Sequence, residues 1–172
     1  LLQRAGVTDD TAALTIAAEA AGHPLFIDEL ARHVSVHGTT SATPLVLDDA
    51  LVARADAMPD HPRRLLSLVA VAGRPTRQDV IAVAAALDRD PTEFNRALSL
   101  LRASHLVQTG GSRGRDTVMC FHDRVRESVT TALTDDARRS LHRDLAWALD
   151  ASGTSDPETL AFHWAAAGDT AR

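Results

Sequence analysis

Apolar side chains recur every three or four residues along most of the chain, which is the spacing of amphipathic helices. Leu65, Leu68 and Ala72 show this spacing in one segment, with polar positions between them. The same period, bounded by Gly, Pro and Asp residues, predicts nine helical segments. They are residues 11–22, 23–38, 45–59, 60–73, 76–88, 90–105, 123–133, 134–152 and 156–168.

The pattern changes between residues 105 and 122. "HLVQTGG" and "DTVMCFH" are short β-like runs, and the "SRGR" between them is typical of a turn, so we predict a β-hairpin here. Three helices followed by a hairpin is the order of a winged helix, whose second and third helices form a helix-turn-helix pair. Alternating βαβ units are missing, so the pattern argues against a Rossmann or P-loop core within this chain.

Composition places the chain among ordinary globular proteins, with 45% hydrophobic and 24% charged residues. No apolar run approaches the roughly 20 residues of a membrane-spanning helix, so we expect no membrane partner. Cys120 is the only cysteine. It can form neither an internal disulfide nor a multi-cysteine metal site, and a reducing, cytoplasmic location is the simplest expectation.

All 18 basic side chains are arginines, and the net charge is −5. The lack of lysine excludes a GxxxxGK phosphate-binding loop and a Schiff-base lysine within this chain. The acidic balance argues against general affinity for nucleic acid, and the absence of tyrosine argues against a base-stacking surface.

The stretch "CFHDRVRES" (residues 120–128) contains the most suggestive polar pair, His122 and Asp123. Neighbouring positions on a helix point about 100° apart, and no HxxxH or HExxH pattern lies nearby, so we predict no metal site. Nothing marks Ser128 or Ser140 as a nucleophile with an oriented base, and we predict no catalytic residue.

Two interpretations of this pair stay open. In the first, Asp123 caps the following helix and His122 packs at the end of an apolar stripe that continues through Val125 and Val129. In the second, the free N–H groups and partial positive charge of the helix N-terminus favour an anion, and the imidazole donates a hydrogen bond to it. His142 and His163 lie on separate predicted helices without a metal-binding pattern, and we interpret His163 as a packing residue.

The stretch "AGHPLFIDELARH" resembles the segment "GNPLFLEEL" of STAND-type ATPases, the signalling branch related to AAA and NB-ARC ATPases. The matching positions are Gly22, Pro24, Leu25, Phe26, Glu29 and Leu30. His23 stands where the family commonly has Asn. Further segments resemble the same family in the same order: "LDDALVARADAMP", "RRLLSLVAVAGR", "ALSLLRASHLVQTGG", "VMCFHDRVRESV", "RRSLHRDLAWALD" and "ETLAFHWAAAGD". Since each piece alone is weak, the ordered set carries the resemblance.

This resemblance implies a mainly α fold in three parts. Residues 1–46 would form a small helical lid that follows an absent P-loop core. Residues 47–133 would form a winged helix with one β-hairpin, and residues 134–172 a helical linker and the start of a tetratricopeptide-like α-solenoid. Because the first residue is Leu1 rather than Met, we expect the chain to be a piece of a longer protein.

The resemblance further implies a regulatory, nucleotide-dependent function, as in large ATP-binding LuxR-type transcription regulators or kinases and cyclases with an attached ATPase module. ATP or ADP would lie between the P-loop core of the same longer chain and the lid and winged helix. In the family, a Gly-x-Pro turn packs against adenine, which assigns Gly22 and Pro24 to that task. Cys120-Phe121-His122-Asp123 resembles the family's Met-His-Asp motif, whose histidine holds the β-phosphate of ADP.

Several expectations follow from that assignment. The chain itself would not be an enzyme and would hold no nucleotide tightly, whereas the parent protein would be a weak regulatory ATPase. Downstream repeats would bind protein partners or effectors.

Two other functions remain as alternatives. One is a DNA-binding winged-helix transcription regulator, in which Arg96 and Arg102 on the recognition helix and Arg113 and Arg115 at the hairpin tip would contact nucleic acid. The acidic chain and the few basic side chains on that helix place this alternative second. The other is a protein-interaction scaffold with no nucleotide role.

Overall fold

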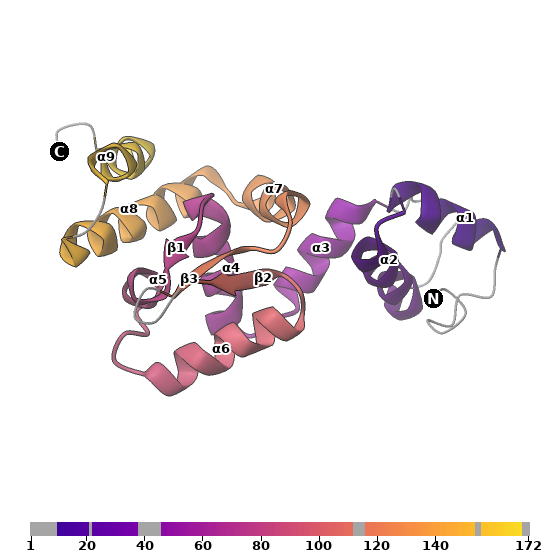
Figure 1. The fold of residues 1–172 in the computed structure, drawn as a ribbon. Coiled ribbons are helices and arrows are strands. Elements are labelled where there is room, and N and C mark those ends of the chain that lie inside the picture. Colours follow the sequence, from indigo (N-terminus) through magenta and orange to yellow (C-terminus); the bar gives the residue numbers. More distant parts are fainter. Residues whose placement is uncertain (1–9, 21, 38–45, 112–115, 154–155, 170–172) are drawn as a thin grey trace. The chain divides into compact units, whose positions relative to one another are not determined.

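The computed structural model (Figure 1) describes residues 10–20, 22–37, 46–111, 116–153 and 156–169. These ranges contain nine helices and three short strands, so the protein is mainly helical with a small sheet. The chain divides into two compact units, a first unit of residues 1–54 and a second unit of residues 55–172. Among the helices of the described ranges, none combines the length and the apolar character that crossing a membrane requires.

The first unit contains α1 (Asp10–Glu19), α2 (Pro24–His37) and most of α3 (Leu47–Asp56). Its buried apolar side chains come from all three helices: Ile16, Ala20, Phe26, Leu30, Ala31, Leu47, Ala50 and Leu51. The Glu19 carboxylate accepts a hydrogen bond of 3.1 Å from the Leu47 backbone N–H at the first residue of α3. One of the unsatisfied N–H groups of α3 is thereby bonded to the end of α1.

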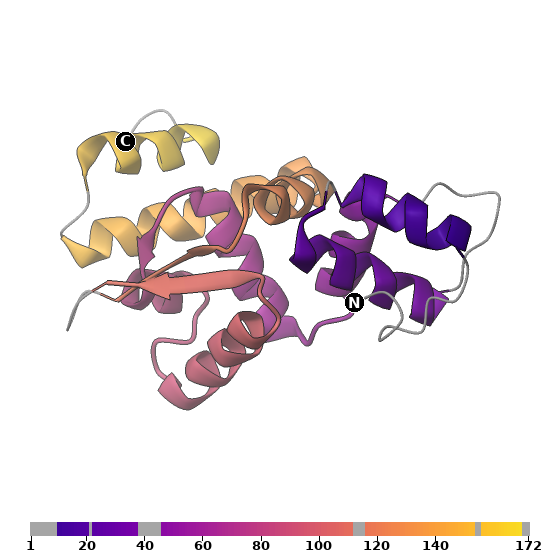
Figure 2. The same cartoon turned by 45° about the vertical axis from the view of Figure 1, so that its right-hand side comes forward.

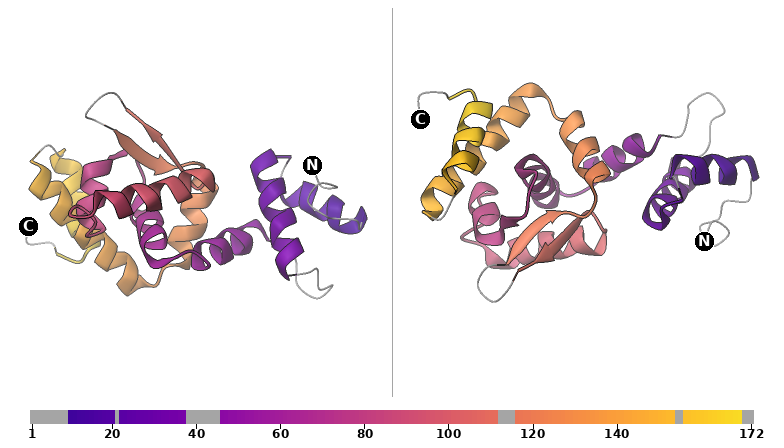
Figure 3. Two further views of the ribbon diagram at one scale, coloured as in Figure 1. Left: turned by 90° about the horizontal axis from the view of Figure 1, so that it is seen from below. Right: turned by 45° about the horizontal axis from the view of Figure 1, so that its top comes forward.

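The second unit begins with α4 (Asp60–Ala72), β1 (Thr76–Arg77), α5 (Gln78–Ala84), α6 (Pro91–Ala103), β2 (Val107–Gly110) and β3 (Thr117–Cys120). The strands form one antiparallel sheet in the order β1-β3-β2. Its register pairs Val107 with Cys120 and Thr76 with Val118. Figure 3 shows α6 running alongside the β2–β3 hairpin.

Three further helices complete the second unit: α7 (Asp123–Ala132), α8 (Asp135–Ser152) and α9 (Pro157–Ala166). The central element is α4, which contacts α5, α6, α7, α8 and β3. Its side chains Leu65, Leu66, Leu68 and Val69 are almost fully buried. Figure 2 shows α9 lying alongside α8, and α8 also packs against α4 and α5.

Local capping chemistry explains why several helices begin where the sequence predicts. Asp90 accepts a hydrogen bond from the Glu93 N–H at 3.0 Å and caps α6, whose first residue is Pro91. In the same way, Thr134 caps α8 and Asp156 caps α9. These starts are set by two or three adjacent residues, and the sequence prediction is confirmed at all three.

The stretch after Gly73 differs from the prediction of a helix over residues 76–88. Thr76 and Arg77 are extended and pair with β3, so the sheet has three strands rather than a hairpin alone. The helix begins at Gln78 and ends at Ala84, and Ala86 has a left-handed φ of 59°. The partner strand β3 lies about 40 residues further along the chain. Helix-type periodicity is a local pattern and therefore contains no information about this pairing.

Candidate functional site

The N-terminus of α7 holds the His122–Asp123 pair. The backbone at His122 is extended, with φ −144° and ψ 148°, and its Nδ1 accepts a hydrogen bond of 3.2 Å from the Arg124 N–H. The imidazole is therefore the cap of α7, and the interpretation of Asp123 as the cap is wrong. Asp123 is the first helical residue, with a largely exposed carboxylate 3.5 Å from the Arg126 Nε.

This cap determines the protonation pattern of the imidazole. Because Nδ1 of His122 accepts from the backbone, the neutral ring carries its proton on Nε2. The ring is half-buried, whereas Val125 and Val129 on the same face of α7 are buried. A histidine held in this tautomer, at a helix end with a partial positive charge, presents a donor suited to an anion.

The two residues before His122 have contrasting environments. Cys120 is buried, and burial raises the pKa of its thiol to about 12, so it stays protonated and inert as a nucleophile at neutral pH. Phe121 is 38% exposed and meets the His105 ring edge-on, with ring centroids 5.8 Å apart.

Gly22 and Pro24 form the turn between α1 and α2 in the first unit. Gly22 has φ 74°, and a Cβ built on it would meet nothing within 4 Å, so the turn needs its backbone freedom rather than its small size. Pro24 occupies the first position of α2 and is exposed. Between them, the His23 ring lies against Phe26 with centroids 4.6 Å apart. His122 belongs to the second unit.

The residues proposed for nucleic-acid contact are only partly covered by the described ranges. Arg96 is 83% exposed and lies 3.9 Å from the Glu93 carboxylate. Arg102 lines a polar groove of about 350 Å³ between α6 and the β2–β3 hairpin, together with Asp116. Arg113 and Arg115 lie outside the described residues. Arg96 therefore lies near one carboxylate, and Arg102 shares its groove with another, which lowers the net charge that this face offers to a phosphate backbone.

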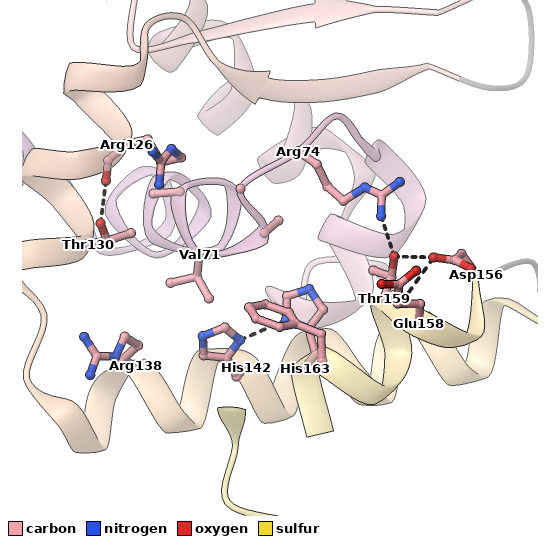
Figure 4. A pocket seen from close by; sticks show the side chains of 14 residues that line it. Val71, Arg74, Arg126, Thr130, Arg138, His142, Asp156, Glu158, Thr159 and His163 are labelled. Carbon is pink, nitrogen blue, oxygen red and sulfur yellow. Dashed lines mark hydrogen bonds between the residues drawn. The ribbon is translucent and has the colours of Figure 1, made fainter. Parts of the chain in front are cut away.

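A larger pocket of about 600 Å³ lies between the end of α4, α7, α8 and α9 (Figure 4). Its lining includes apolar side chains from α4 and α9 and cationic side chains from several elements. The lining residues are Ala70, Val71, Ala72, Gly73, Arg74, Arg126, Thr130, Arg138, His142, Asp156, Glu158, Thr159, Phe162 and His163. All of them belong to the second unit.

Two histidines meet in the wall of this pocket. His142 from α8 and His163 from α9 are 7% and 2% exposed, and their Nδ1 atoms are 2.9 Å apart. Such a bond requires one ring to donate its Nδ1–H and the other to accept. Burial lowers the pKa of both rings, to about 4 for His163; Arg138 adds to the shift at His142, and His142 and then Arg74 add to the shift at His163. The pair is therefore neutral at pH 7.

The prediction that His163 is a packing residue is confirmed, because its ring is buried. Its hydrogen bond with His142 was not predicted. A signal for His142 exists in the sequence, because it falls on the apolar face of its helix with Leu145 and Leu149. No local pattern reveals that this face meets His163, which lies 21 residues further along.

The arginines at the pocket come from two helices and from the loop after α4. Arg74 follows α4 and donates to the Thr159 hydroxyl, a neutral partner. Arg126 from α7 approaches Asp123 and Glu127, and Arg138 from α8 donates to Asp135 at 2.7 Å. Figure 4 shows Arg126 and Arg138 on one side of the pocket and Arg74 with the α9 residues on the other.

Within the part of the chain that the structure describes, no three His, Cys, Asp or Glu side chains gather as a metal site requires.

Comparisons of the chain with protein-family models, curated proteins and solved structures find no match. Functional assignment therefore depends on the residues and their geometry.

Proposed function

We propose that this chain is the lid and winged-helix part of a nucleotide-dependent signalling switch of the STAND type. In the full-length protein, a P-loop core would bind ATP or ADP, and the lid and winged helix would close over it and relay its state to an output domain. The observation that carries the proposal is the imidazole cap of α7. It holds His122 in the tautomer that donates through Nε2, directly after the last strand of the sheet.

The topology of the second unit supports the winged-helix assignment. The order α4, β1, α5, α6, β2, β3, with β3 between the other two strands, is the one in which a short first strand joins a C-terminal hairpin. The α8–α9 pair that follows supports the start of a helical repeat array, because packed helix pairs are the units of such arrays.

The proposed roles of individual residues follow from their chemistry. The exposed Pro24 ring offers a flat apolar face and no competing donor, and Gly22 permits the turn that presents it, which suits an adenine base. His122 would donate to a phosphate oxygen. Nucleotide binding would favour one of two arrangements of the full-length protein, and the chain described here would supply contacts rather than catalysis.

Substitutions at His122 in the full-length protein test this function. His122→Ala removes both the cap and the donor, whereas His122→Ser keeps a capping oxygen but cannot reach as far as an imidazole. We expect both variants to weaken ADP binding about tenfold, the loss of one hydrogen bond to a charged group, and to raise basal output. ADP affinity is measured by calorimetry.

The matched control is His61→Gln, which alters an exposed imidazole on α4 in the same unit. It should leave ADP affinity and output unchanged. If His122→Ser binds ADP like the unmodified protein, the histidine serves only as a cap, and the protein-scaffold alternative becomes the better account.

The DNA-binding alternative is tested separately by the mobility of duplex DNA mixed with the chain at rising salt concentration. Phosphate contacts by Arg96 and Arg102 would give a shift that weakens with salt. Because these side chains lie beside Glu93 and Asp116, we expect no shift.

A further inference from the structure

The pocket between α4, α7, α8 and α9 combines an apolar surface with converging arginines. Its volume of about 600 Å³ falls within the range of small-molecule sites, roughly 300–1,000 Å³. We propose that it binds a small organic anion, namely a carboxylate or phosphate monoester carried on a ring-sized apolar body. This site is separate from the nucleotide contact proposed for His122 and does not depend on it.

The apolar part of the pocket supplies the surface for the body of such a ligand. Phe162 lines it from α9, and Ala70, Val71 and Ala72, each at most 7% exposed, line it from the end of α4. Phe162 is 58% exposed, so a large aromatic face borders the pocket while still in contact with water. Covering that face with an apolar ring removes its area from water and favours binding.

The charged part of the pocket supplies the anion contacts. Three guanidinium groups, of Arg74, Arg126 and Arg138, line it against two carboxylates, of Asp156 and Glu158, which leaves a net charge of +1 while the histidines are neutral. Arg74 donates its hydrogen bond to the neutral Thr159 hydroxyl, and its charge also acts on the nearby Asp156 carboxylate. The Asp156 carboxylate already accepts from the N–H and hydroxyl groups of Thr159 at the start of α9.

The partners of the other two arginines do not prevent anion binding. Arg126 approaches Asp123 and Glu127 at 3.5 and 3.4 Å, and neither of these carboxylates lines the pocket. Arg138 is half-exposed and bonds to Asp135, which also lies outside the lining. Exposed ion pairs of this kind are worth little, so a guanidinium can exchange such a partner for a ligand oxygen.

The histidine pair is the part of the pocket whose titration should respond to a bound anion. Burial lowers the pKa of both rings, and the nearby guanidinium groups of Arg138 and Arg74 lower the pKa of His142 and His163 further. The charged groups that line the pocket around the pair are these two arginines, Arg126, Asp156 and Glu158. A bound anion opposes the arginine charge, so it must raise the pKa of the imidazoles, and binding must tighten as pH falls toward their titration range.

Four probes separate the two halves of the proposed ligand, with the 172-residue chain as the protein. They are 2-naphthoate, 2-naphthyl phosphate, the uncharged 2-naphthol and inorganic phosphate. We expect one or both of the naphthyl anions to bind at least tenfold more tightly than 2-naphthol and than inorganic phosphate, as measured by calorimetry. The naphthoate and naphthyl phosphate arms distinguish a carboxylate ligand from a phosphate ester.

A pair of arginines on α8 provides a matched variant and control. Arg138 bonds to Asp135 and lines the pocket, whereas Arg139 bonds to Asp136 three residues before it in the same way and does not line the pocket. Arg138→Gln should weaken the naphthyl anion about tenfold, the loss of one charge-assisted contact, and Arg139→Gln should leave affinity unchanged. Both positions are exposed, so both variants should fold, which circular dichroism checks.

The imidazole signals provide the second measurement. In NMR spectra of ¹³C-histidine-labelled protein, the bound naphthyl anion should raise the pKa of His142 and His163, and it should leave the signals of the exposed His61 at the start of α4 unchanged. The proposal is overturned if neither anion binds, if 2-naphthol or inorganic phosphate binds equally well, or if Arg138→Gln and Arg139→Gln behave alike. Loss of ADP binding in His122→Ala has no bearing on any of these results, so the two proposals fail independently.

Discussion

Both units bury polar side chains beside arginines, but the arginines have opposite effects in the two places. In the first unit, the Glu29 carboxylate is 3% exposed and forms salt bridges with Arg32 and Arg54. In the second unit, burial lowers the pKa of the His142 and His163 imidazoles, and the like charge of nearby Arg138 and Arg74 lowers it further. The buried Glu29 carboxylate is charged and is stabilised by its two arginines, whereas the buried His142–His163 pair is stable only while both rings are neutral.

This contrast has an energetic meaning. Burial lowers the pKa of Arg54, and Glu29 opposes the shift, as expected for a guanidinium that gives up water for a buried carboxylate. Removing one partner of a buried ion pair leaves an uncompensated charge and costs several kcal/mol. The neutral histidine pair buries no charge at pH 7. It destabilises the fold only at low pH, where protonation would place a positive charge in the buried site. We therefore expect the first unit to respond mainly to charge substitution and the second unit to pH.

The largest expected effect is that of Glu29→Gln, which removes the charge and nearly preserves the volume. The free energy of unfolding of the first unit should fall by about 3 kcal/mol, because two guanidinium groups lose their shared carboxylate. Urea unfolding followed by far-UV circular dichroism reports both units. Tryptophan fluorescence reports the second unit alone, since Trp147 and Trp164 are the only tryptophans.

The control for this variant is Asp28→Asn, which changes a neighbouring but exposed carboxylate. It should alter stability by less than about 0.5 kcal/mol, as is usual for surface substitutions. The tryptophan transition should remain in place in both variants. Equal stability of Glu29→Gln and the unmodified chain would contradict the role assigned to the cluster.

A smaller effect is expected from acidification of the second unit. The pKa of His163 is about 4 in the folded state against an ordinary value of 6.5, so the unfolded state binds more protons between these values and stability falls as pH falls. At about 1.4 kcal/mol per pKa unit, His163 accounts for a loss of about 2 kcal/mol between pH 7 and pH 5. His142 shifts in the same direction.

Tryptophan-detected urea unfolding between pH 7 and pH 4.5 measures this dependence. In His163→Gln, the dependence on pH should flatten relative to the unmodified chain, even if the stability at pH 7 is lower. His61→Gln removes an exposed imidazole and should keep the original slope. A slope unchanged by His163→Gln would show that other groups cause the pH dependence.

The sequence predicts the helices of this protein better than its contacts, for a physical reason. Asp90, Thr134 and Asp156 each cap a helix through the residue three positions later, so both partners are visible in one short stretch. The strand Thr76–Arg77 depends on pairing with β3, and its residues also fit a helix start. Local sequence patterns therefore predict where the helices lie, whereas pairing between distant segments changes where some of them begin.

The candidate sites also combine features that the sequence predicts with features that it does not. The position of His122 at the start of a helix follows from the hairpin and the periodicity around it. Its role as the cap does not, because Asp, Asn, Ser and Thr are the usual capping residues and Asp123 is adjacent. The pocket with His142 and His163 assembles from four helices, and no spacing along the chain indicates that their faces meet.

The smallest expected effect concerns a polar contact that is neither charged nor fully buried. The His122 ring forms its capping bond with the Arg124 N–H while half-exposed, so His122→Ala should lower the stability of the second unit by only about 1 kcal/mol, the usual cost of losing a cap. His122→Ser should restore most of that loss, as tryptophan-detected unfolding would show. A loss of stability well above this value would show that His122 stabilises the second unit as a buried polar group does, and not only as a helix cap. Equal stability of the Ser variant and the unmodified chain would mean that any change in ADP binding reflects the missing imidazole donor and not a weakened helix.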